Sequence, residues 1–94
     1  MTRLEIIEIR TTGKNHGALE SYLVNWQAEA QTIVSAPLIK IYKHAALETD
    51  FSIHLLYDDE TKESDVRILS DRLTADLKAF GLVNHTVWRE YRGQ

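Results

Sequence analysis

The chain has 94 residues, a formal net charge of −3 and no cysteine. This length predicts a single domain over residues 1–94, and the lack of cysteine excludes disulfides, iron–sulfur clusters and cysteine nucleophiles. The negative charge and the scattered lysines and arginines argue against a nucleic-acid partner, and no apolar run approaches the ~20 residues of a membrane-spanning helix.

Apolar periodicity predicts a strand, a helix, two strands, a second helix and a final strand. The strands are expected at 4–11, 38–44, 50–57 and 82–91, and the helices at 19–33 and 66–80. Asn15 or a neighbouring residue is expected to cap the first helix, and Thr61 or Ser64 the second. Gly81 is expected to end the second helix in a left-handed conformation, with Leu82 folding back on it.

This order of elements is typical of a ferredoxin-like βαββαβ domain of the α+β class, with a four-stranded antiparallel sheet and two helices on one face. The short connection at 45–49 favours a hairpin. If His44 pairs with Asp50, Lys40 lies opposite His54. The helices then leave the far face of the sheet uncovered.

Several apolar and aromatic residues are predicted on that far face. Alternation along the strands places Tyr42, His54, Leu56 and Trp88 there. A monomer would leave this patch in water, so the sequence predicts a homodimer joined through the sheet face.

Two stretches carry a resemblance to a known family. They are FSIHLLYDD, which leads into an acidic turn and a helix, and the ending AFGLVNHTVWREY. With the order of elements over nearly the whole chain, they resemble the dimeric α+β barrel proteins, and within them the antibiotic-biosynthesis-monooxygenase-like small proteins. The resemblance implies a homodimer with a pocket between sheet and helices. Members of this family include cofactor-free monooxygenases and haem-degrading enzymes.

The chain departs from both enzyme types of that family. Tyr57 stands where monooxygenase members usually carry tryptophan, and the asparagine that accompanies it has no clear match. The haem-degrading members use an asparagine on the first strand and a histidine on the second helix, and neither is present here. No haem and no other cofactor is therefore expected.

The residues themselves suggest a ligand pocket. Tyr22, Trp26, Tyr57 and His85 could line an aromatic slot with polar tips for a small planar organic ligand, or they could be ordinary core. No metal site is expected, because the assumed hairpin register separates His44 and His54 by about 13 Å. The acidic residues at 58–65 are interpreted as a solvated turn.

The sequence thus favours a cytoplasmic, homodimeric small-ligand-binding protein that resembles the cofactor-free monooxygenase-like barrels. The alternative is an interaction or regulatory module without chemistry, which uses the sheet face only for assembly. An enclosed empty pocket at Tyr57 and His85 would favour the first, and a packed space there the second. The sequence names no reaction and no catalytic residue.

Overall fold

The computed structural model describes residues 2–33, 36–58, 61 and 63–91. Its helices and strands follow the predicted order: β1 (Arg3–Thr11), α1 (His16–Ala30), β2 (Leu38–Lys43), β3 (Asp50–Tyr57), α2 (Glu63–Leu77) and β4 (Gly81–Arg89). The strand boundaries lie within two residues of those expected from alternation, and those of β3 coincide with the prediction.

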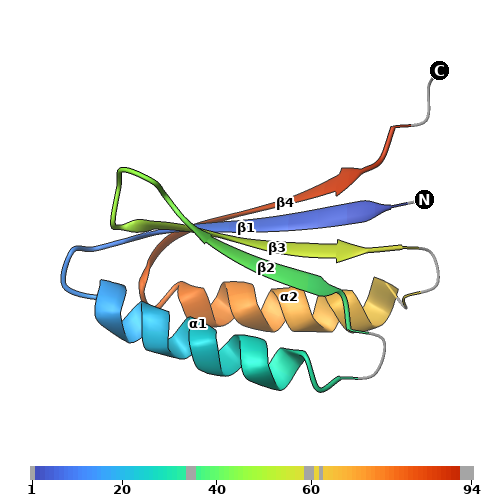
Figure 1. Cartoon of the computed structure of the whole chain (residues 1–94), viewed down its shortest axis with the longest axis horizontal. Coiled ribbons are helices and arrows are strands. Elements are labelled where there is room, and N and C mark those ends of the chain that lie inside the picture. The colour runs from blue at the N-terminus through green and yellow to red at the C-terminus, as the bar shows by residue number, and fades with distance from the viewer. Residues whose placement is uncertain (1, 34–35, 59–60, 62, 92–94) are drawn as a thin grey trace.

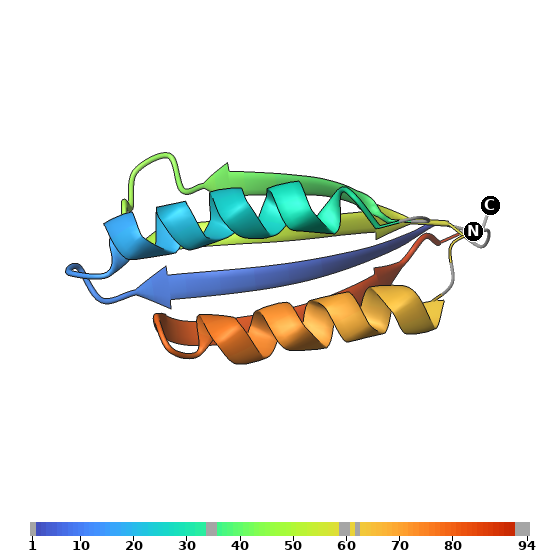
Figure 2. The ribbon, with the colours of Figure 1, turned by 90° about the horizontal axis from the view of Figure 1, so that it is seen from below.

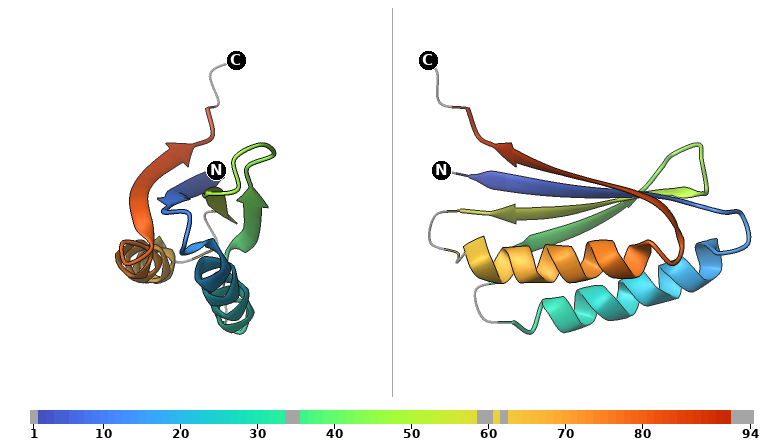
Figure 3. Two further views of the ribbon diagram at one scale, coloured as in Figure 1. Left: turned by 90° about the vertical axis from the view of Figure 1, so that its left-hand side faces the viewer. Right: turned by 180° about the vertical axis from the view of Figure 1, so that it is seen from behind.

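The four strands form one antiparallel sheet in the order β2-β3-β1-β4. Both helices lie against the same face of this sheet (Figures 1 and 3). From the helix side, α1 crosses over β3 and α2 runs along β4 (Figure 2). This confirms the ferredoxin-like βαββαβ fold. Neither helix, within the described ranges, is long and apolar enough to cross a membrane.

The predicted register of the β2–β3 hairpin is confirmed. Lys40 pairs with His54, and the backbone N–H of His44 donates to the carbonyl of Asp50 over 2.8 Å. A shift of one residue would exchange the two faces of the strand, so this register decides which side chains meet the helices.

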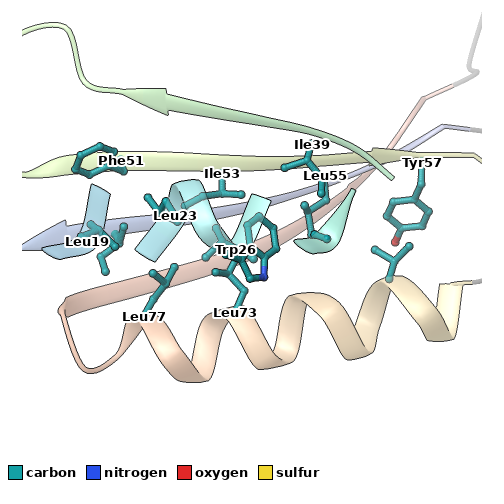
Figure 4. Packing of buried hydrophobic residues seen from close by; sticks show 14 residues of the cluster. Leu19, Leu23, Trp26, Ile39, Phe51, Ile53, Leu55, Tyr57, Leu73 and Leu77 are labelled. Atoms are coloured by element: carbon teal, nitrogen blue, oxygen red, sulfur yellow. The ribbon is translucent and has the colours of Figure 1, made fainter. Parts of the chain in front are cut away.

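The hydrophobic core lies between the sheet and the two helices (Figure 4). The helices contribute leucines at the spacing of one helical face, and the strands contribute alternate residues. Fully burying one such aliphatic side chain contributes roughly 1.5–3 kcal/mol. The core cluster consists of Ile7, Ile9, Leu19, Leu23, Trp26, Ala30, Ile39, Phe51, Ile53, Leu55, Tyr57, Val66, Leu73 and Leu77.

The expectations for helix ends needed correction. Asn15 occupies the cap position of α1, but its side chain makes no capping hydrogen bond. Ile33 lies past the end of α1 and is 47% exposed, because the helix ends at Ala30 before the apolar stripe continues. Ser64 lies inside the first turn of α2 and is not its cap. Of the predicted acidic turn, residues 59, 60 and 62 lie outside the described residues.

Gly81 is needed for a reason other than the predicted one. It is the first residue of β4, pairs with Thr11, and does not adopt a left-handed φ. A Cβ atom at this position would collide with the backbone carbonyl of Arg10. Leu82 is 78% exposed and does not fold back on α2. The close approach of β1 to β4 therefore requires the glycine.

Candidate functional site

A carboxylate lies in the row that β1 turns toward the helices. Glu5 shares this row with Ile7 and Ile9, and it is 0% exposed. Burying a carboxylate is costly unless hydrogen-bond donors and opposite charges replace the water that it loses. The surroundings of Glu5 therefore have to supply polar partners.

The two strands that flank β1 supply hydrogen bonds to Glu5. The Tyr57 hydroxyl donates to Oε2 over 2.9 Å, and Nε2 of His85 lies 2.8 Å from Oε1. In the sheet register, Arg3 pairs with Tyr57 and Ile7 pairs with His85, so both partners are diagonal to Glu5. Diagonal side chains on one face of a sheet can reach one another. The sheet thus brings a tyrosine and a histidine to one carboxylate from opposite sides.

Helix α2 adds opposite charge above this carboxylate. A guanidinium nitrogen of Arg67 lies 3.6 Å from Oε2 of Glu5 and 3.9 Å from Oε1 of Glu63, one turn earlier in the helix. Arg3 also pairs with Glu63. Alternating charges therefore lead from the buried carboxylate to the surface. We call the innermost four residues, Glu5, Tyr57, Arg67 and His85, the Glu5 cluster.

Burial raises the pKa of Tyr57 above its ordinary value, and the hydrogen bond to Glu5 raises it further. Both effects favour the protonated phenol, since a phenolate would lose its hydration and face the carboxylate. Figure 4 shows the side chain of Tyr57 pointing from β3 toward α2. Tyr57 therefore acts as a hydrogen-bond donor to Glu5 throughout the neutral pH range.

Access to the Glu5 cluster is uneven. Glu5 is 0% exposed and Tyr57 is 5% exposed, whereas the side chains of His85 and Arg67 are 18% and 41% exposed. A ligand from solvent would therefore meet His85 and Arg67 first.

Tyr22 and Trp26, which were predicted to share a pocket with Tyr57 and His85, lie in a different place. They line a groove of about 450 Å³ on the helical layer. The Tyr22 hydroxyl donates to Asp76 over 2.7 Å, and burial together with this hydrogen bond raises the pKa of Tyr22. Trp26 is 7% exposed and belongs to the core. Among the described residues, no hydrogen bond joins Tyr22 to the Glu5 cluster.

The residues predicted for a dimer interface do share the sheet face that lacks helices. Leu4 pairs with Leu56 on one side and with Trp88 on the other, and the rings of Tyr42 and His54 lie 4.8 Å apart. Tyr42 is 50% exposed and Trp88 is 58% exposed. In the single chain these apolar and aromatic side chains are exposed beside charged ones such as Glu8 and Lys40.

The histidines near that face are engaged locally. Nδ1 of His44 accepts the backbone N–H groups of Ala46 and Leu47, and Nε2 of His54 lies 2.9 Å from the Ser52 hydroxyl. In the described part of the chain, no three histidine or carboxylate side chains gather as ligands for a metal ion.

Neither a protein-family model nor a curated protein matches the sequence. Solved structures do match the fold. A variant of SnoaB, a cofactor-independent oxygenase from Streptomyces nogalater, gives a TM-score of 0.75 at 9% identity, over 98% of this chain and 95% of its own. A protein from Nitrosomonas europaea, provisionally assigned as an antibiotic biosynthesis monooxygenase, gives 0.76 at 12% identity over 97% and 91%. A conserved protein from Methanosarcina mazei gives 0.78 at 6% identity over 97% and 94%.

The chain has the antibiotic-biosynthesis-monooxygenase fold. The resemblance inferred from the sequence is therefore confirmed at the level of fold. At these sequence identities, however, a similar fold does not imply a shared activity. Proteins of unknown function share this monooxygenase-like fold as well, among them one from Nitrosomonas europaea.

Within this monooxygenase-like fold, Glu5 and Arg67 are the residues of the Glu5 cluster that sequence reasoning missed. Tyr57 and His85 were singled out, but the carboxylate that joins them was not. A signal was available, since Glu5 is an acidic residue in the same alternating row as Ile7 and Ile9. A charge in an inward row of a central strand indicates that partners exist elsewhere in the chain.

Proposed function

We propose that the protein is a homodimer that binds a small organic molecule beside Tyr57 and His85, between the sheet and the helices. The observation that carries this proposal is the Glu5 cluster, in which a buried carboxylate holds a tyrosine and a histidine by hydrogen bonds of 2.9 and 2.8 Å. Ionisable groups collected at a buried position are typical of binding and catalytic sites. The oxygenase among the proteins of similar fold supports the same class of function.

The chemistry of the cluster suits proton transfer. A histidine can accept or donate a proton near neutral pH, and water is largely excluded from Tyr57 and Glu5. An activity at this site would depend on Tyr57 or His85 and not on the acidic turn. No reaction beyond this class is assigned.

Dimerisation would cover the face of the sheet that the helices leave exposed. Each 100 Å² of apolar surface that a second copy covers contributes roughly 2.5 kcal/mol before the entropic cost of association. Tyr42, Leu56 and Trp88 are among the exposed side chains that a second copy would cover. A cytoplasmic location stays a prediction from the sequence.

The ligand site is tested by native mass spectrometry of the protein purified from its own source, followed by binding of whatever ligand co-purifies. Tyr57→Phe and His85→Ala are expected to weaken binding, whereas Asp59→Asn in the acidic turn is expected to leave it unchanged. An effect confined to Asp59→Asn would contradict the assignment of the site.

One observation favours the alternative of an interaction module without chemistry. Every buried polar side-chain atom in the described ranges has a hydrogen-bond partner, and a fully satisfied cluster can serve to hold the sheet and α2 together. This alternative predicts a stable dimer that carries no small molecule. It also predicts that His85→Ala changes stability alone.

A further inference from the structure

The groove of about 450 Å³ on the helical layer is formed by residues of both helices, which lie side by side in Figure 2. On α1 these residues are spaced three and four positions apart, so they share one helical face, and on α2 they are one turn apart. The volume is within the range of small-molecule sites, roughly 300–1,000 Å³. We call this the α1–α2 groove. It is lined by Tyr22, Asn25, Trp26, Glu29, Arg72 and Asp76.

Trp26 brings an unpartnered hydrogen-bond donor to the α1–α2 groove. Only 7% of this residue is exposed, because its ring packs into the core. Among the described residues, none accepts a hydrogen bond from its indole N–H, and none of their buried side-chain nitrogen atoms lacks a partner. Nε1 is therefore open to solvent, and Figure 4 shows it on the edge of the ring away from the strands. An indole N–H only donates, so a molecule in the groove has to supply an acceptor.

Charges of both signs line the α1–α2 groove. Within the described part of the chain, the exposed side chains of Glu29 and Arg72 make no ion pair. Asp76 accepts the hydrogen bond of the Tyr22 hydroxyl over 2.7 Å. Burial and this hydrogen bond raise the pKa of Tyr22, the carboxylate of Glu29 raises it further, and the guanidinium of Arg72 lowers it. The charges of Glu29 and Arg72 therefore act on the interior of the groove.

We propose that the α1–α2 groove binds a free amino acid with an apolar side chain, at a site separate from that of the proposed function. The carboxylate of the amino acid accepts hydrogen bonds from Nε1 of Trp26 and from the guanidinium of Arg72, and its ammonium group pairs with the carboxylate of Glu29. Its apolar side chain lies against the ring of Tyr22, which is half-buried at the groove.

The charges of the groove favour such a zwitterion over simpler ions. A carboxylate without an amine would be repelled by Glu29 and Asp76. An amine without a carboxylate would leave Nε1 of Trp26 without an acceptor and would add a positive charge beside Arg72. A molecule that carries both groups gives the indole N–H its acceptor and meets each charge with its opposite.

The indole N–H of Trp26 reports on binding directly. The chain has two tryptophans, so proton–nitrogen NMR spectra of the full-length protein contain two indole signals. L-leucine is expected to move the Trp26 signal downfield, because its carboxylate accepts this N–H, with a Kd of about 1 mM or lower. The signal of Trp88 is the internal control. Its N–H already donates to the Thr86 hydroxyl over 2.9 Å, outside the groove, and is expected not to move.

Two derivatives of leucine separate the contributions of its charged groups. N-acetyl-L-leucine lacks the ammonium group, and L-leucinamide lacks the carboxylate. Each is expected to bind at least about tenfold more weakly than leucine, which corresponds to the loss of one charge-assisted hydrogen bond.

Variants of the exposed groove residues assign these contributions to positions. The preference for leucine over N-acetyl-leucine is expected to disappear in Glu29→Gln, and the preference over leucinamide is expected to shrink in Arg72→Gln. Lys78→Gln is the matched control, because it removes an exposed charge from the region that follows α2 without touching the groove. It is expected to leave all three affinities unchanged.

Three outcomes would overturn the proposal. Equal affinities of the wild-type protein for leucine and its two derivatives would contradict a zwitterionic ligand. Preferences that persist unchanged in Glu29→Gln and Arg72→Gln would show that the ligand lies elsewhere. If leucine, methionine and phenylalanine all leave the Trp26 signal in place up to about 20 mM, the groove is not an amino-acid site. None of these outcomes bears on a ligand beside Tyr57 and His85, because those residues do not line the groove.

Discussion

The two faces of this sheet are formed by the same strands, but a carboxylate on one face is buried and a carboxylate on the other face is exposed. On the helix face, Glu5 is buried and held by Tyr57, Arg67 and His85. On the far face of the same strand, Glu8 is exposed. The helices exclude water from one face, so a polar group there needs protein partners. Within one chain, the helices therefore cover one face of the sheet and leave the other face exposed.

The largest expected effect comes from removing the buried carboxylate. Glu5→Ala should lower the free energy of unfolding by about 3 kcal/mol, because the Tyr57 hydroxyl and the charge of Arg67 lose their partner. Urea denaturation followed by circular dichroism measures the change. Glu8→Ala, on the same strand, should change it by less than about 0.5 kcal/mol. Equal changes in the free energy of unfolding for the two substitutions would contradict the difference between the two faces.

The next effect concerns the far face. Trp88→Glu should weaken the proposed dimer by at least about 30-fold, or about 2 kcal/mol, because a charge replaces a large exposed aromatic side chain of the far face. Sedimentation velocity at micromolar concentration measures this directly. Val24→Glu is the matched control, because Val24 is also exposed but lies on α1. A monomeric wild type, or a Trp88→Glu variant that stays dimeric, would show that the face has another role.

A smaller effect is expected from the hydroxyl of Tyr57. Tyr57→Phe should cost about 1 kcal/mol at neutral pH, the contribution of one hydrogen bond. The folded-state pKa of Tyr57 is raised. The contribution of its hydroxyl to the free energy of unfolding is therefore fully present below the unfolded-state pKa of about 10, and it is lost as the pH rises through the folded-state pKa.

Denaturation at pH 7 and above pH 10 tests this dependence. The gap between wild type and Tyr57→Phe should shrink at the alkaline end, and Tyr22 contributes equally to both proteins. A gap that widens above pH 10 would contradict the raised pKa of Tyr57.

The smallest effect belongs to an exposed ion pair of the far face. Arg10 donates hydrogen bonds to both carboxylate oxygens of Asp50, which lowers the pKa of that carboxyl. The stabilisation that the ionised Asp50 carboxyl contributes to the folded state is present above the unfolded-state pKa of about 4. It is lost as the pH falls through the lower folded-state pKa. Asp50→Asn should therefore lower the urea midpoint slightly at pH 7 and leave it unchanged near pH 2. A difference that persists at the acid end would point to a cause other than charge.

Local pattern was sufficient for much of the fold. The row Phe51, Ile53, Leu55 and Tyr57 predicted β3 and its inward face, because alternation reports burial directly. The short connection between β2 and β3 predicted a hairpin, and the register assumed for it, with Lys40 opposite His54, is the one observed. The end of α1 did not follow, since Ile33 continues the apolar spacing although the helix ends at Ala30. Helix ends depend on where the chain must turn, and spacing alone does not contain that information.

The candidate site was predictable only in part. Tyr57 and His85 were predicted as pocket residues because alternation places them on the helix face of the sheet. Tyr22 and Trp26 were predicted for the same pocket, but they line another groove. The sequence contains no direct sign that Glu5 touches residues 52 and 80 positions away. Those contacts exist because β3 and β4 flank β1 in the sheet.

By itself, the sequence determined the order of the elements, the hairpin between β2 and β3 and which alternate residues of β3 face the helices, because each depends on neighbours a few positions apart. Only the tertiary structure decided that Glu5, Tyr57, Arg67 and His85 form one cluster, and that Gly81 is required where β4 meets Arg10. Both depend on which distant strands lie side by side, and that is settled by packing of the whole sheet against its helices.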